Sequence, residues 1–133
     1  MKVVADTVVE CGGTHIGVLP RYMAEYAYPD LTELVWTDTM SERKEYIRSV
    51  ARELAIVLPG GIGTMDEFFE TLTLAKLGKY DGHILVCNIK GYYDNLEALL
   101  DYFVRSGMLD PAARALVDFP TSLEEFEKLL EAC

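Results

Sequence analysis

The residues best suited to chemistry in this sequence form one glycine-rich stretch, Leu58-Pro59-Gly60-Gly61-Ile62-Gly63-Thr64-Met65-Asp66-Glu67. An apolar run at 54–58 precedes it and predicts a buried parallel strand. An amphipathic run that ends at Gly78 follows it and predicts a helix. Glycines between a strand and a helix let backbone N–H groups approach an anion, and the helix dipole favours negative charge at that place. The stretch therefore predicts a phosphate-binding loop.

Two polar side chains at the end of the stretch extend this prediction. We expect Thr64 to cap the helix and to offer its hydroxyl to the same anion. We expect Glu67 in the first turn of the helix, with its carboxylate beside the anion site. A capping box, Thr64-x-x-Glu67, explains the same spacing without a ligand, and many strand-to-helix loops contain glycine for structural reasons alone.

A second group of candidate residues lies on a predicted helix at about 40–54, which opens with a capping box, Thr39-x-x-Glu42. Arg43 lies by its spacing in the stripe that we expect to be buried, and Lys44 is one position off it. A cation in the first turn is unfavourable, because the helix N-terminus is already positive. A local rule broken in this way often marks a functional site, although an ion pair of Arg43 with Glu42 or a nearby carboxylate is a structural alternative. The expected buried stripe is Met40, Ile47, Val50 and Leu54.

Both groups follow a predicted strand and open a predicted helix. In a parallel sheet such positions lie on the same edge, and consecutive strands are usually neighbours. We therefore expect Arg43 and Lys44 to lie beside Glu67 and the loop at 60–64. Anion donors, cations and one carboxylate would then share a single crevice.

The same residues resemble the motifs of a known family. The run Pro59–Glu67 resembles the PGGxGTxxE motif of the lonely guy (LOG) family, and Met40–Ile47 is similar to its arginine-lysine motif. Further similar stretches are His15–Pro20 and Asn88–Asp94, and the likeness runs from the first residue to the last. The family comprises cytokinin riboside 5′-monophosphate phosphoribohydrolases, long described as "possible lysine decarboxylases".

The resemblance implies hydrolysis of the N-glycosidic bond of a nucleoside 5′-monophosphate, which yields a free base and ribose 5-phosphate. Glu67 would stabilise the positive charge that develops on the ribose and activate water, and Arg43 would hold Glu67 or the ribose hydroxyls. The implied catalytic residues are thus Glu67 and Arg43, and the implied substrate-binding residues are Lys44, Gly60, Gly61, Gly63 and Thr64. This reaction needs no metal and no other cofactor.

Other functions stay open at this point. The motifs would also suit a nucleosidase acting on AMP or another ordinary nucleotide, a non-catalytic nucleotide-binding module, or an inactive truncated relative. Decarboxylation of lysine would need a pyridoxal phosphate site, and the lysines here have no recognisable context for one.

Composition limits the class of protein. The chain has 133 residues, 50% of them hydrophobic and 26% charged, which is typical of one globular domain spanning 1–133. Its net charge of −10 argues against binding to nucleic acid or to an anionic membrane. No signal-peptide pattern and no apolar run long enough to cross a membrane are present. Because Cys11, Cys87 and Cys133 are odd in number and far apart, we expect reduced thiols in a cytoplasmic protein and no zinc site.

Alternating apolar and amphipathic segments predict an α/β fold, a Rossmann-like parallel sheet with helices on both faces. The expected strands lie at 14–19, 33–37, 54–58, 83–88 and 114–118. The expected helices lie at 2–11, 40–54, 64–77 and 94–106, and a last helix follows a cap at Thr121 or Ser122. In this last helix we expect Leu123, Phe126 and Leu130 to face inward.

The resemblance also implies that the domain is N-terminally incomplete, because the family begins with a strand, a helix and a strand before the segment that Met1–Asp6 resembles. We expect the strand at 14–19 to lack the neighbours that would join it to the other strands, and the chain alone to be poorly soluble and weakly active. The resemblance and the aromatic segment Tyr22–Tyr28 further suggest a homodimer.

Overall fold

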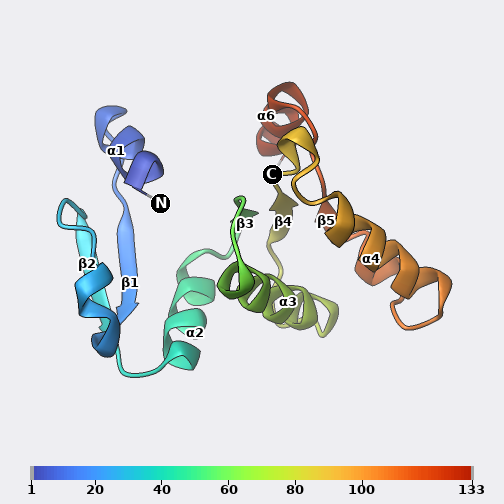
Figure 1. Ribbon diagram of the computed structural model, residues 1–133, viewed down its shortest axis with the longest axis horizontal. Coiled ribbons are helices and arrows are strands. Elements are labelled where there is room, and N and C mark those ends of the chain that lie inside the picture. The colour runs from blue at the N-terminus through green and yellow to red at the C-terminus, as the bar shows by residue number, and fades with distance from the viewer. Residues whose placement is uncertain (1, 133) are drawn as a thin grey trace. The chain divides into compact units, whose positions relative to one another are not determined.

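The computed structural model describes residues 2–132 and has an α/β fold of helices and parallel strands, which confirms the predicted class (Figure 1). The chain divides into two compact units, Met1–Val50 and Ala51–Cys133. Among residues 2–132 the strands form two parallel sheets rather than one continuous sheet. The prediction of one domain over 1–133 stays a prediction.

The first unit, blue to teal in Figure 1, is built on a pair of parallel strands. The strands pair with Val18 opposite Val35, and β1 pairs with β2 alone, as expected for the strand predicted at 14–19. The unit consists of α1 (Lys2–Glu10), β1 (Ile16–Pro20), the 3-10 helix η1 (Arg21–Tyr26), β2 (Glu33–Thr37) and α2 (Met40–Val50).

Helix α2 begins as the sequence predicts and ends earlier. The N–H of Glu42 donates to the hydroxyl of Thr39 at 3.1 Å, and the carboxylate of Glu42 accepts the N–H of Asp38 at 2.9 Å. The capping box is therefore confirmed. The expected buried stripe is wrong, because Val50 is 54% exposed and Leu54 belongs to the next strand.

The second unit, green to red in Figure 1, contains three parallel strands in the order β3-β4-β5. Its core contains strand residues, helix residues spaced one turn apart, such as Phe68 with Leu72 and Leu96 with Leu100, and the loop residues Tyr80 and Tyr93. The unit comprises β3 (Leu54–Val57), α3 (Ile62–Lys76), β4 (His83–Val86), the 3-10 helix η2 (Ile89–Gly91), α4 (Asp94–Arg105), α5 (Pro111–Arg114), β5 (Val117–Asp118) and α6 (Leu123–Ala132).

Helix α3 ends where its glycine predicts. Gly78 has a φ of +65°, a conformation that L residues with a side chain adopt at a cost. Its N–H donates to the carbonyl of Ala75 at 3.0 Å, and the N–H of Lys79 donates to that of Leu74 at 2.8 Å. These two bonds satisfy carbonyls that the end of the helix would otherwise leave without partners.

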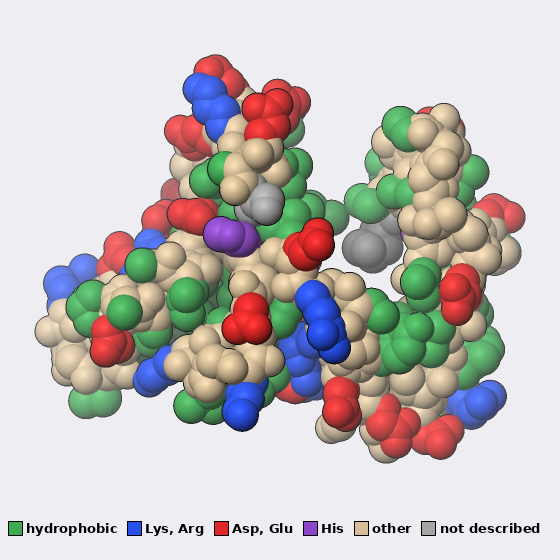
Figure 2. Space-filling view, turned by 180° about the vertical axis from the view of Figure 1, so that it is seen from behind, with side chains coloured by type: hydrophobic (Ala, Val, Ile, Leu, Met, Phe, Trp, Pro, Cys, Tyr) green, Lys and Arg blue, Asp and Glu red, His purple; other side chains and the backbone are tan. Residues whose placement is uncertain are grey.

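Two predictions for the C-terminal part are wrong. The strand expected at 114–118 is limited to Val117–Asp118, because Asp110 and Pro111 start a short helix through Arg114. Helix α6 begins after a cap at Ser122, as predicted, but none of its described residues is buried. Carboxylates gather on this helix, at the upper left of Figure 2.

Two further sequence expectations concern cysteines and membranes. Cys11 is exposed, Cys87 is buried and both are free, whereas Cys133 lies outside the described residues. Over residues 2–132, no helix combines the length and the apolar composition that crossing a membrane requires.

Candidate functional site

The glycine-rich loop joins β3 to α3 in the second unit, as the sequence predicts. Gly61 is the N-cap of α3, and the first helical hydrogen bond runs from the N–H of Met65 to the carbonyl of Gly61 at 3.1 Å. The three N–H groups in between, those of Ile62, Gly63 and Thr64, have no acceptor within the helix. They point out of the positive end of the helix dipole, which is the arrangement that binds phosphate.

The positions of Thr64 and Glu67 differ from the prediction. Because α3 begins at Ile62, Thr64 is its third residue and not its N-cap, and no side chain caps this helix. Glu67 therefore lies in the second turn, and the Thr64-x-x-Glu67 capping box is wrong as well. The sequence misplaced the helix start because Thr and Gly are about equally favoured as N-caps, so residue type alone does not distinguish Thr64 from Gly61. Glu67 is half-buried.

Gly60 allows the loop to close against the helix. A Cβ built on Gly60 would lie 2.2 Å from the hydroxyl oxygen of Thr64, so no larger residue fits unless Thr64 moves. At Gly61 and Gly63 an added Cβ would meet nothing within 4 Å. Gly60 thus sets the position of the Thr64 hydroxyl, while the space over Gly61 and Gly63 is open to an incoming group.

Two tyrosines that follow β4 hold this loop. The hydroxyl of Tyr93 donates to the carbonyl of Leu58 at 2.7 Å and accepts the N–H of Gly60 at 3.1 Å. The hydroxyl of Tyr92 donates to the carbonyl of Gly60 at 3.1 Å. Nothing in the sequence identified the loop as the hydrogen-bonding partner of these tyrosines.

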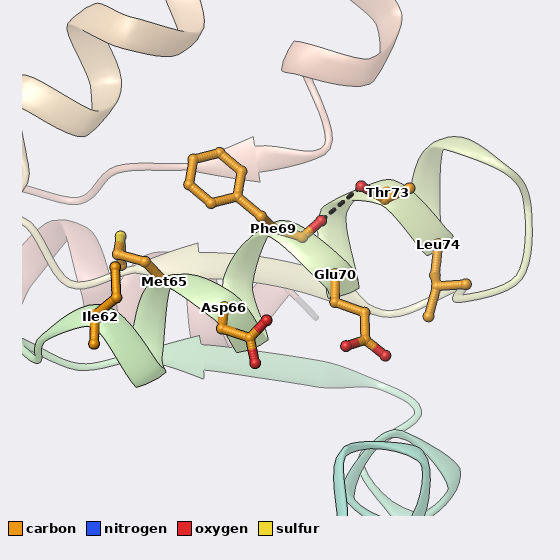
Figure 3. A pocket seen from close by; sticks show the side chains of 7 residues that line it. All are labelled: Ile62, Met65, Asp66, Phe69, Glu70, Thr73 and Leu74. Carbon is orange, nitrogen blue, oxygen red and sulfur yellow. Dashed lines mark hydrogen bonds between the residues drawn. The ribbon is translucent and has the colours of Figure 1, made fainter. Parts of the chain in front are cut away.

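A groove of about 740 Å³ runs along α3 beside the loop (Figure 3). Met65 and Phe69 point to one side of the helix, and Asp66 and Glu70 point to the other. Glu67 does not line this groove. Its full lining is Ile62, Met65, Asp66, Phe69, Glu70, Thr73 and Leu74.

Arg43 and Lys44 lie in the first turn and a half of α2, in the first unit, and both are half-buried. The Nε of Arg43 donates to the carbonyl oxygen of Val18 at 2.9 Å, so Arg43 is oriented by the strand β1. The carboxylate of Glu42, the suggested partner, accepts the N–H of Asp38 in the helix cap at 2.9 Å. Because these cations and the loop belong to different units, their predicted meeting with Glu67 stays a prediction.

Comparison with known proteins finds relatives of this chain along nearly its whole length. The protein-family model described as "possible lysine decarboxylase" matches residues 1–130. A cytokinin riboside 5′-monophosphate phosphoribohydrolase of Mycobacterium tuberculosis is 39% identical over 115 residues, which cover 85% of this chain and 61% of that protein. A probable enzyme of the same name from Arabidopsis thaliana is 37% identical over 127 residues, or 92% of this chain and 63% of the relative.

A third relative, the phosphoribohydrolase of Mycobacterium marinum, is 33% identical over 135 residues and is covered to 70% of its length. The chain thus spans about three-fifths of the first two relatives and somewhat more of the third. Because the family model matches nearly the whole chain, this protein belongs to the possible lysine decarboxylase family, the lonely guy family of cytokinin riboside 5′-monophosphate phosphoribohydrolases.

Proposed function

We propose that this protein hydrolyses the N-glycosidic bond of a nucleoside 5′-monophosphate of the cytokinin riboside type. The observation that carries the proposal is the sequence Pro59–Thr64 at the start of α3, in a family whose curated relatives are named phosphoribohydrolases. The name "possible lysine decarboxylase" describes the family model, but no relative cited above is named for that activity.

The phosphate would bind at the loop between β3 and α3. The N–H groups that open α3 and the hydroxyl of Thr64 are the donors we assign to it, with Gly61 and Gly63 leaving room for its oxygens. Gly60 would serve binding by letting Thr64 approach the loop backbone. Lys44 is proposed as a further contact of the anion, since a chain with a net charge of −10 needs local cations to hold it.

Glu67 is the carboxylate that we assign to the chemical step. Water attacks C1′ of the ribose, the C1′–N bond breaks, and the base leaves with its bonding electrons and takes up a proton. The transition state has positive charge on the ribose, which a carboxylate stabilises while it takes the proton of the attacking water. Arg43 is proposed to orient Glu67 or the ribose hydroxyls. The products are the free base and ribose 5-phosphate.

We also propose a homodimer. Tyr22 and Tyr26 on η1 are 66% and 68% exposed, which is much aromatic surface for one short segment. The mass in solution, measured by light scattering, tests this proposal, and a monomer at working concentration would contradict it.

The experiment is a nucleotide panel followed by two matched variants. Release of ribose 5-phosphate from prenylated adenosine monophosphate, but not from AMP or GMP, supports the cytokinin substrate, and release from AMP alone identifies an ordinary nucleosidase. Glu67→Gln is expected to lower kcat at least about 100-fold with nucleotide binding retained. Glu127→Gln, at an exposed carboxylate of α6, is the control and keeps near-native kcat. Binding without turnover by the native protein would identify a nucleotide-binding module.

A further inference from the structure

We propose that Tyr93 is a positioning residue for the nucleotide phosphate, because its hydroxyl fixes the loop that receives the phosphate. The inference deepens the proposed function and rests on it, in that the loop before α3 is taken as the phosphate site. Tyr92 supports the same loop from its exposed side. Neither tyrosine is assigned to contact the reacting atoms.

The hydroxyl of Tyr93 closes a turn that the backbone cannot close alone. It donates its proton to the carbonyl of Leu58 at 2.7 Å and accepts the N–H of Gly60 at 3.1 Å. Those two groups flank Pro59, which has no N–H to contribute. One side-chain oxygen therefore joins the end of β3 to the residue before the N-cap of α3.

Tyr93 is itself held in place by its burial and by a hydrogen bond of its backbone. Its side chain is buried, and its N–H donates to the Oδ1 of Asn88 at 2.6 Å. Asn88 is also buried, and its Nδ2 donates to the Oδ1 of Asp94 at 2.9 Å. The turn between them has positive φ angles at Lys90 and Gly91, 63° and 72°. Such a conformation persists only where the surroundings support it, so the tyrosine has a fixed place relative to β4.

These hydrogen bonds also determine which backbone groups remain available to bind the anion. The N–H of Gly60 points to Tyr93, and its carbonyl accepts the hydroxyl of Tyr92. The donors directed at a phosphate are then those of Ile62, Gly63 and Thr64, whose direction follows from the fixed position of Gly60. Burial raises the pKa of the Tyr93 hydroxyl, which keeps it protonated and able to donate to Leu58.

The test uses Tyr93→Phe, which removes the hydroxyl and keeps the ring. The matched control is Tyr80→Phe. Tyr80 is also buried, and its hydroxyl donates to the carbonyl of Ala51 at 2.9 Å, away from the loop. The readouts are amide hydrogen exchange at Gly60 without ligand and the Kd for ribose 5-phosphate, with ribose as the probe that lacks a phosphate.

We expect Tyr93→Phe to speed exchange at Gly60 and to weaken binding of ribose 5-phosphate about 10-fold, with ribose binding unchanged. Tyr80→Phe should change neither readout. Equal values for the two variants would overturn the proposal. If Tyr93→Phe does not fold, Tyr92→Phe replaces it, because Tyr92 is 55% exposed and its substitution disturbs the core less. An unchanged Kd in that variant also overturns the proposal.

Different results would contradict the hydrolase activity and the positioning role of Tyr93. If the native protein binds ribose 5-phosphate and Tyr93→Phe weakens this binding, but no nucleotide is hydrolysed, the hydrolase proposal fails and the positioning role stands. If nucleotides are hydrolysed and both tyrosine variants bind like the native protein, only the positioning role fails. Absence of ribose 5-phosphate binding by the native protein overturns the positioning role, and absence of nucleotide turnover as well overturns both.

Discussion

The Nε of Arg43 donates a hydrogen bond of 2.9 Å to the carbonyl oxygen of Val18, a buried residue of the neighbouring strand β1. A guanidinium is planar, so a bond at Nε sets the plane in which its two terminal nitrogens lie. Arg43 is therefore a cation whose direction is fixed by the sheet. This differs from an exposed arginine that a surface carboxylate holds, such as Arg21 with Asp38 at 3.3 Å.

Arg43→Ala is expected to lower kcat about 100-fold, because the reaction loses an oriented donor. Loss of the hydrogen bond to Val18 should lower the free energy of unfolding by about 1 kcal/mol, the usual net worth of such a bond. Nucleotide turnover and urea unfolding measure the two effects. Arg21→Ala is the control and should leave turnover and stability near native. Native turnover per folded molecule in the Arg43 variant would mean that Arg43 has a purely structural role.

The glycines of the loop provide a matched pair. Gly60→Ala places a methyl group 2.2 Å from the hydroxyl oxygen of Thr64, so we expect a loss of about 1–3 kcal/mol in stability together with weaker phosphate binding. Gly63→Ala meets no atom within 4 Å and lies inside α3, so it should raise stability by about 0.5–1 kcal/mol. A Gly63→Ala protein that is more stable and yet binds ribose 5-phosphate less tightly would place the phosphate over Gly63. Unchanged binding would place it elsewhere.

The sequence predicted which segments of the site are helices and strands better than it predicted the residue at which each one begins. Helical spacing identified α3, and Gly78 gave its end, because few residues adopt a positive φ as readily as glycine. The start of the helix was missed by two residues, since Thr and Gly cap helices about equally well and residue type does not decide between Thr64 and Gly61. The contact of Tyr93 with the loop joins residues 33 apart and leaves no periodic trace in the sequence. The strand expected at 114–118 failed because apolar residues in a short run do not distinguish a strand from a helix.

Substitution of Arg114 should lower the stability of the protein, because this residue makes several interactions. Its Nη2 lies 3.0 Å from a carboxylate oxygen of Glu97, and its Nε lies 2.8 Å from one of Asp101. It also donates to the carbonyl of Val117 at 3.0 Å and stacks over Phe119. Arg114→Ala should cost about 2 kcal/mol, since hydrogen bonds to charged groups are the strong ones and Arg114 is only 20% exposed.

Thermal and urea unfolding check this expectation. The control is Lys128→Ala, which removes an exposed pair with Glu124 at 2.7 Å and should cost only about 0.3–0.5 kcal/mol. A loss equal to that of the control would mean that the ion pairs of Arg114 contribute nothing measurable.

The start of α6 should respond to acid. The N–H of Thr121, and then its hydroxyl, lower the pKa of Glu125 from its ordinary value of 4.5. A carboxylate whose pKa is lower in the folded protein stabilises the fold above its unfolded pKa, and this contribution is lost as the pH falls. The protection factor of the Thr121 amide, which corrects exchange for the intrinsic rate at each pH, should therefore fall below about pH 4.5. Glu125→Gln should show a low protection factor at every pH, and a native protein whose protection factor does not depend on pH would contradict the cap.

The order of strands in the second unit predicts which of its segments unfold first. β4 lies between β3 and β5, and Ile84, Leu85 and Val86 are each at most 1% exposed. Its backbone is therefore bonded on both sides, whereas β5 has two residues and α6 has no buried residue among those described. Local unfolding takes the least buried segments first. The molecule should thus lose its C-terminal helix while β4 still protects its amides, so the slowest-exchanging protons of this unit report its global unfolding free energy directly.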